Sequence, residues 1–163
     1  MQLSILNQYK ENTRIEAKKA VGGLPRSIWE TYSAFANTSG GVILLGVAEN
    51  KKDKTLYPVD LPDPCRLVAQ FWELINDKRV VSVNLLKKTD VTIENAEGKE
   101  IVVIRVPKAK RTQRPVYIGN NPKTGAYYRD GEADLRFSEE QVEQLLQEAK
   151  LPKEIPSQKI KSK

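Results

Sequence analysis

Residues 33–49 read SAFANTSGGVILLGVAE, and this is the most specific segment of the chain. Its first part continues a helical pattern of apolar residues that begins after Pro25, a residue suited to the first turn of a helix. Small polar residues and the pair Gly40-Gly41 then predict the end of that helix. The uninterrupted apolar run Val42–Val47 follows, which predicts a strand buried on both faces.

Shorter patterns on either side of this segment indicate further elements. Residues 14–21 are consistent with a short strand or a weak helix. Asp63-Pro64 begins a second helix that reaches about Asn76, and Ser138 caps a last helix. Strand composition occurs in residues 80–86, in a hairpin formed by 91–95 and 101–106, and in a pair formed by 115–118 and 126–129.

Together these elements predict an α/β (mixed α+β) single domain, with a central mixed β-sheet flanked by about three helices. We expect this domain to span residues 1–149. Residues 150–163 contain two prolines and five lysines without an apolar pattern, and they predict a basic disordered tail or linker. Such an end is also consistent with further domains C-terminal to Lys163 in a longer natural chain.

Composition restricts the chemistry. The chain has 163 residues, a single cysteine and no histidine, which excludes an internal disulfide, a Cys-cluster metal site, His-ligated zinc and His-activated nucleophiles. Any catalysis must therefore use carboxylates, lysines, hydroxyls or a metal ion bound by oxygen. No apolar run approaches the roughly 20 residues of a membrane span, and no export signal is visible, so a cytoplasmic protein without a membrane partner is expected.

Basic residues are concentrated in two places. The net charge is +6, but the tail holds five lysines and one glutamate, which leaves 22 basic and 20 acidic residues in 1–149. The run 105–114, RVPKAKRTQR, contains five cations and no acid. Such a run is either a solvated loop or, beside Tyr117, Tyr127, Tyr128 and Arg129, a surface that binds phosphates and stacks on bases.

Three motifs together resemble the Schlafen-type AlbA domain. They are ENTRIEAK at 11–18, SAFANTSGG at 33–41 and ILLGVAE at 43–49, with PVYI at 115–118 and YYRDG at 127–131 matching later parts of the family. The resemblance covers roughly residues 8–149. It implies a mixed α/β domain assigned to nucleic-acid binding, which in bacteria is usually the N-terminal module of transcriptional regulators. In animal Schlafen proteins, related domains cleave tRNA-like RNA.

The resemblance also implies a set of acidic site residues. Glu11, Glu16 and Glu49 fall at the positions of a metal-binding triad in those nucleases, and Lys18 falls at the neighbouring lysine. Two residues depart from the family pattern, since Ala17 stands where an aromatic residue is usual and Glu49 where aspartate is usual. Without the resemblance, the same residues are interpreted as ordinary surface acids beside basic neighbours.

Three functions follow as hypotheses. The leading one is a DNA- or RNA-binding module of a regulator, with contacts from Lys18, Lys108, Lys110, Arg111, Arg114, Tyr128 and Arg129. The alternative is an endoribonuclease in which Mg²⁺ or Mn²⁺ is held by Glu11, Glu16 and Glu49, with Lys18 as a further catalytic residue. The third is a protein-interaction or oligomerisation module. The animal nucleases use two such lobes, and a homodimer of this chain would supply the second.

Overall fold

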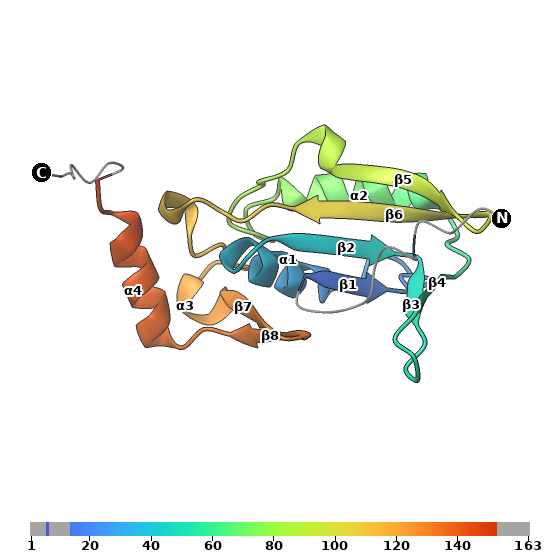
Figure 1. Cartoon of the computed structure of the whole chain (residues 1–163). Coiled ribbons are helices and arrows are strands. Elements are labelled where there is room, and N and C mark those ends of the chain that lie inside the picture. The colour runs from blue at the N-terminus through green and yellow to red at the C-terminus, as the bar shows by residue number, and fades with distance from the viewer. Residues whose placement is uncertain (1–5, 7–13, 153–163) are drawn as a thin grey trace, which may run out of the picture.

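The computed structural model of the protein describes Leu6 and residues 14–152, and it places a four-stranded mixed sheet at the centre (Figure 1). The strand order is β1 (Ile15–Lys18), β2 (Gly41–Leu45), β6 (Lys99–Val106) and β5 (Val91–Ala96). β1 and β2 are parallel, while the β2–β6 and β6–β5 pairs are antiparallel. The predicted fold class, a mixed α+β domain with a central mixed sheet, is confirmed.

Within the described residues, four helices and two small hairpins lie around this sheet. The helices are α1 (Ile28–Asn37), α2 (Pro64–Ile75), the four-residue α3 (Pro122–Gly125) and α4 (Glu139–Ala149). The hairpins are β3 (Val47–Glu49) with β4 (Leu56–Pro58), and β7 (Tyr127–Asp130) with β8 (Ala133–Arg136). The described residues also contain two short 3-10 turns, η2 (Lys88–Asp90) and η3 (Arg111–Gln113). No helix in the described part of the chain is long and apolar enough to cross a membrane.

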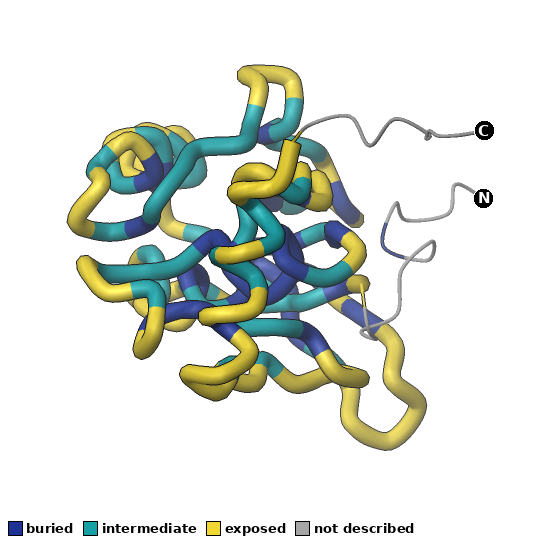
Figure 2. Tube along the Cα trace, turned by 90° about the vertical axis from the view of Figure 1, so that its left-hand side faces the viewer, coloured by how far each residue is buried: buried dark blue, intermediate teal, exposed yellow. Residues whose placement is uncertain are grey.

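Both faces of the sheet are covered, as the apolar run in β2 predicts. Side chains alternate along a strand, so Ile43 packs against α1 and α2 on one face, and Leu44 packs on the opposite face with Leu6, Val47 and Leu56. Exposed residues are concentrated in the loops, and buried residues in the strands and in α1 (Figure 2). The central strand therefore has no solvent-facing side.

The segment Val42–Val47 is buried, as predicted, but the prediction that it forms one continuous strand is wrong. Gly46 has a positive φ of 83° and ends β2 at Leu45, and the chain then enters a different sheet. The Gly46 N–H donates to the Lys18 carbonyl at 2.9 Å, and its own carbonyl accepts from Val59 at 2.8 Å. A glycine suits this position because residues with a Cβ rarely adopt positive φ.

Two further predicted strands are absent from the described residues. Residues 80–86 contribute only an isolated bridge from Val81 to Ile118, and residues 115–118 make only a second bridge, from Tyr117 to Ala126. The backbone groups of these segments bond to side chains of α1 and of the loops in place of a strand ladder. Residues 127–130 pair with β8, a strand that the sequence analysis did not predict.

Other predictions agree with the structure. Residues 15–18 take the strand alternative, and the hairpin of 91–95 with 101–106 is confirmed. Asp63 caps α2 and Ser138 caps α4, each accepting a backbone N–H from the first turn at 3.1 Å. α1 begins three residues later than Pro25. The predicted division into residues 1–149 and a tail stays a prediction, because 153–163 lie outside the described residues.

Tyr32 supplies the first testable prediction. Its buried hydroxyl donates to the Val83 carbonyl and accepts from the Leu85 N–H, both at 2.9 Å. We expect Tyr32→Phe to lower the free energy of unfolding by about 1–3 kcal/mol, because two buried backbone groups lose their partner. Denaturant unfolding at pH 7 measures this change. Tyr57→Phe, which alters an exposed tyrosine, is the control and should change stability by less than about 0.5 kcal/mol.

The same hydroxyl makes stability depend on alkaline pH. Burial raises the pKa of Tyr32 to about 12, and the hydrogen bond from Leu85 offsets part of that rise. Since the unfolded pKa is about 10, the contribution is constant below pH 10 and is lost as the pH rises from 10 to 12. The Tyr32→Phe variant should show a smaller loss of stability over this interval. An unchanged pH profile would contradict the assignment.

Candidate functional site

Polar residues of the 33–41 motif attach the C-terminal part of the domain to α1. The Ser33 hydroxyl donates to the Val116 carbonyl at 2.7 Å and accepts from the Tyr127 N–H at 3.0 Å. The Asn37 side-chain amide donates to the Val116 and Tyr127 carbonyls at 2.8 and 2.9 Å, and its oxygen accepts from the Val116 N–H at 2.8 Å. Ser33 and Asn37 are buried, so these bonds hold two distant segments side by side.

The end of α1 also fixes the chain that follows β6. Gly40 has a φ of 73°, and its N–H donates to the Phe35 carbonyl at 2.7 Å, which confirms the predicted helix end. A Cβ on Gly40 would lie 2.8 Å from the Val106 carbonyl oxygen and 3.1 Å from the Lys108 nitrogen. The Ala109 N–H donates to the Ala36 carbonyl at 2.8 Å. The backbone at Gly40 and the backbone that follows β6 can therefore lie this close only because glycine has no Cβ.

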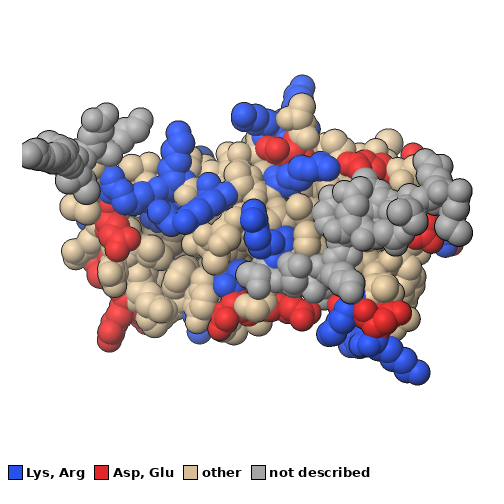
Figure 3. Space-filling model, in the orientation of Figure 1, with Lys and Arg blue, Asp and Glu red and all other residues tan. Residues whose placement is uncertain are grey.

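The segment held in this way is the basic loop, residues 107–114. Lys108 and Lys110 are exposed, and Arg111 and Arg114 are half-buried. No carboxylate in the described part of the chain lies within 4.0 Å of these four cations. Figure 3 shows basic side chains gathered over the end of β6 and this loop. The predicted cationic surface is thus present at Lys108 and Lys110.

The two arginines of the basic loop are half-buried, and one of them bonds to another element. The Arg111 guanidinium donates to the carbonyls of Glu148, Leu151 and Pro152, the last at 2.8 Å. A cation at the C-terminus of a helix satisfies free carbonyls and opposes the negative end of the helix dipole, so Arg111 attaches α4 to the loop. Arg114 has a buried Nε without a hydrogen-bond partner among the described residues.

Arg129, predicted as a surface contact, lies in the interior. Its side chain is 1% exposed, and its guanidinium binds Glu16 at 2.9 Å and Asp134 at 2.8 Å. It also lies 4.9 Å above the centre of the Phe35 ring, while its backbone N–H donates to the Thr38 hydroxyl at 2.9 Å. Arg129 therefore joins β1, α1 and the β7–β8 hairpin.

Glu16 and Lys18 complete this group, called here the Arg129 cluster (Glu16, Lys18, Arg129 and Asp134). Lys18 lies 3.7 Å from Glu16, and its ammonium group donates to the Ser27 hydroxyl at 3.0 Å. Asp134 also accepts from the Thr31 hydroxyl at 2.6 Å. The structure thus brings together three of the predicted site residues. It adds Asp134, which lies opposite Arg129 across the two-residue turn Gly131-Glu132. A glycine at the first position of such a turn is a hairpin signature, so this pairing could have been predicted.

The predicted stacking tyrosines are only half exposed. Tyr128 packs on Phe137, with ring centres 4.9 Å apart and planes tilted by 39°. Tyr127 and Tyr117 are half-buried. Burial, and to a lesser extent the nearby Glu30 carboxylate, raises the pKa of Tyr127. The three rings are therefore only partly accessible to a stacking base.

Comparison with known proteins now decides the family. Residues 9–138 match the Schlafen, AlbA_2 family. The chain belongs to the Schlafen AlbA_2 family. A solved relative is the N-terminal domain of a RecG-related protein from Nitrosomonas europaea, with 34% identity and a TM-score of 0.58 over 81% of this chain and 88% of that one.

Two further comparisons were less informative. A Corynebacterium diphtheriae protein of known structure has 16% identity and a TM-score of 0.49, over 77% of this chain and 22% of that one. The search of curated proteins found no match. The predicted Schlafen-type resemblance is confirmed by the family match and by the Nitrosomonas domain.

The acidic triad expected from the Schlafen AlbA_2 family is described only in part. Glu11 lies outside the described residues. Glu16 is bound to Arg129 and Lys18, while one carboxylate oxygen of Glu49 is buried without a hydrogen-bond partner in the described part of the chain. Within that part, no group of three His, Cys, Asp or Glu residues could hold a metal ion. A cation at Glu16 would meet two positive side chains, so the described residues do not fit a divalent metal.

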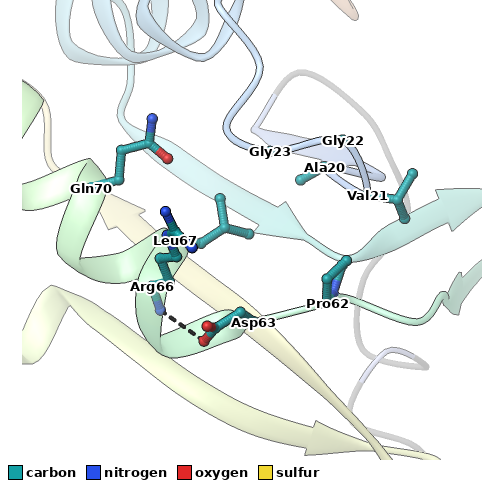
Figure 4. Close-up of a pocket in the computed structure, with 9 residues that line it drawn as sticks. All are labelled: Ala20, Val21, Gly22, Gly23, Pro62, Asp63, Arg66, Leu67 and Gln70. Atoms are coloured by element: carbon teal, nitrogen blue, oxygen red, sulfur yellow. Dashed lines mark hydrogen bonds between the residues drawn. The ribbon is translucent and has the colours of Figure 1, made fainter.

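The domain also has a pocket of about 330 Å³ beside the start of α2 (Figure 4). It is formed by residues 20–23 and by a segment from Pro62 to Gln70. Inside this segment, Asp63 accepts the Arg66 N–H at 3.1 Å as the cap of α2. None of the predicted site residues lines this pocket. The candidate site of this Schlafen AlbA_2 domain is therefore the basic loop, supported by the Arg129 cluster.

Proposed function

We propose that this Schlafen AlbA_2 domain binds nucleic acid through the basic loop, as a module of a regulatory protein. The observation that carries the proposal is the pair Lys108 and Lys110, which are exposed and have no acidic partner among the described residues. Two free ammonium groups on one short loop are suited to contact neighbouring phosphates, and such contacts release counterions from the nucleic acid.

Hydrogen bonds to the backbone of the loop also support this proposal. The Ala109–Ala36 hydrogen bond lies between the two lysines in sequence, and the Gln113 side chain accepts the Lys110 N–H at 3.1 Å. A loop that is ordered before binding loses little conformational entropy on binding. The 33–41 motif thus contributes to binding indirectly, because it holds the basic loop in place.

The Nitrosomonas relative supports the same conclusion. That domain belongs to a protein whose name relates it to the ATP-dependent DNA helicase RecG, and this chain covers 88% of the domain. A domain found at the N-terminus of a protein so named is suited to bring a larger protein to nucleic acid. The endoribonuclease hypothesis stays a prediction, since Glu11 lies outside the described residues.

The test is removal of both exposed charges. For the double variant Lys108→Gln, Lys110→Gln we expect affinity for a 16-base-pair duplex to fall about tenfold per lysine at 0.1 M salt. The slope of log K against log salt should also become shallower by about 2, because each lost phosphate contact contributes about 0.9. Fluorescence anisotropy over a salt series on duplex DNA and on duplex RNA measures both quantities.

A matched control removes the same charge elsewhere. Lys19 and Lys78 are exposed and form no ion pair within the described residues, so Lys19→Gln, Lys78→Gln should keep the wild-type slope. Equal slopes for the loop variant and the wild type would refute the proposed interface. Failure of the wild type to bind either duplex at low salt would refute the proposed function.

A further inference from the structure

The β3–β4 hairpin has a second concentration of basic residues. It projects from the body of the domain (Figure 1), and every residue from Asn50 to Thr55 is exposed. Its tip contains Lys51, Lys52 and Lys54, and Figure 3 shows basic side chains at this end of the molecule. No carboxylate of the described residues lies within 4.0 Å of the three ammonium groups.

The tip is a structured turn. The Asn50 N–H donates to the Thr55 carbonyl at 2.8 Å, and the Lys54 N–H donates to the Asn50 carbonyl at 2.7 Å. The Asn50 side chain accepts the Lys52 N–H at 3.0 Å, and the Asp53 side chain accepts both the N–H and the hydroxyl of Thr55. The backbone that carries the lysines is therefore ordered before any partner binds, which lowers the entropic cost of binding.

One aromatic side chain of this hairpin faces outward. Leu56 and Pro58 are buried against the sheet, and Tyr57 between them alternates to the opposite side, where it is 45% exposed. It lies opposite Ala48 in the hairpin. Among the described residues, Tyr57 is the only aromatic residue in the group of exposed large apolar side chains.

We infer that this hairpin is a second nucleic-acid contact, in which Tyr57 stacks on an unpaired base and the lysines at the tip bind the adjoining phosphates. The inference rests on the proposed function and adds a substrate class to it. An exposed ring beside several cations is the combination that binds single strands, because every base has a face on which a ring can stack. The faces of paired bases inside a duplex are already stacked on their neighbours.

This inference assigns different tasks to the two basic regions. The basic loop contacts phosphates whether or not the bases are paired, whereas Tyr57 requires a base that is free to stack. The preferred partner is therefore nucleic acid that has a single-stranded segment next to a duplex. The three lysines at the tip then contribute to the salt dependence on such a substrate in addition to Lys108 and Lys110.

The test compares two probes of equal duplex length, a blunt 16-base-pair DNA and the same duplex with a 3′ overhang of eight thymidines. For Tyr57→Ala we expect affinity for the overhang probe to fall about tenfold, with binding to the blunt probe unchanged. Tyr57→Phe keeps the ring and should bind both probes as the wild type does. Since Tyr57 is exposed, all three proteins should unfold at the same temperature.

A crosslink locates the contact. With 5-iodouracil in the overhang, irradiation should attach the oligonucleotide to Tyr57, as mass spectrometry of the peptides would show. Equal binding of the overhang probe by Tyr57→Ala and the wild type, or a crosslink confined to residues outside the hairpin, would overturn the inference. In that event Lys108→Gln, Lys110→Gln would still weaken binding to both probes, so the proposed function would survive. If the wild type binds neither probe nor the matching RNAs, both proposals fall.

Discussion

Replacement of Arg129 by methionine is expected to lower the free energy of unfolding by about 3–5 kcal/mol, the usual cost of removing one partner of a buried charge pair. The guanidinium is 1% exposed, and the two carboxylates that it binds, Glu16 and Asp134, are 19% and 16% exposed. Methionine fills a similar volume but leaves both carboxylates without their main cation. Denaturant unfolding, followed by far-ultraviolet circular dichroism, measures the loss.

Two comparisons separate the charge effect from general damage. Arg136→Met removes a cation from an exposed position of the same hairpin and should change stability by no more than about 0.5 kcal/mol. When Glu16→Gln and Asp134→Asn are also present, Arg129→Met should cost much less, because no uncompensated carboxylate remains. An equal cost in both backgrounds would show that Arg129 acts through packing on Phe35 and not through its ion pairs.

The second large effect is expected at Asn37. Its side chain makes three hydrogen bonds to the backbone of Val116 and Tyr127, all between 2.8 and 2.9 Å. Leucine has a similar size but cannot bond, so Asn37→Leu should destabilise the domain by about 3 kcal/mol through unsatisfied buried groups. Hydrogen exchange should accelerate most at the Val116 amide, which loses its acceptor.

The control for this variant is an exposed asparagine at the end of α2. Asn76 caps α2 and bonds to Trp72 and Asn84, but it is exposed. Water can replace its bonds, and Asn76→Leu should cost less than about 1 kcal/mol. If the two variants lose equal stability, or if exchange at residues 115–118 stays slow in Asn37→Leu, the attachment role of Asn37 is wrong.

The 33–41 motif bears on the proposed binding surface through its structural role. Ser33 and Asn37 hold the segments around Val116 and Tyr127, and Gly40 admits the start of the basic loop. The motif therefore positions the surface that carries Lys108 and Lys110. Substitutions in it are expected to change binding through folding, and substitutions in the loop through charge.

Much of the fold could be predicted because its signals are local. The end of α1 before Gly40, the capping residues Asp63 and Ser138, and the hairpin of 91–95 with 101–106 each depend on neighbouring residues only. The break at Gly46 and the irregular segment 80–86 could not be predicted in the same way. Both depend on hydrogen bonds from residues distant in sequence, such as the Tyr32 hydroxyl.

In the candidate site, too, features with local signals could be predicted and features that depend on distant residues could not. Exposure of Lys108 and Lys110 could be predicted, because a run of cations without apolar partners stays in water. The burial of Arg129 could not, since charged residues are buried only when partners from other elements surround them. Glu16, 113 residues earlier in the chain, and Asp134 on the unpredicted strand β8 supply those partners.

The sequence by itself determined the mixed α+β class, the buried central strand, the family and the absence of histidine chemistry. These properties follow from composition and from short-range patterns. The tertiary structure alone decided which charged residues face water and which bind one another. That difference has a physical reason, because the cost of burying a charge depends on the dielectric environment and on partners that only the folded chain brings within a few ångströms.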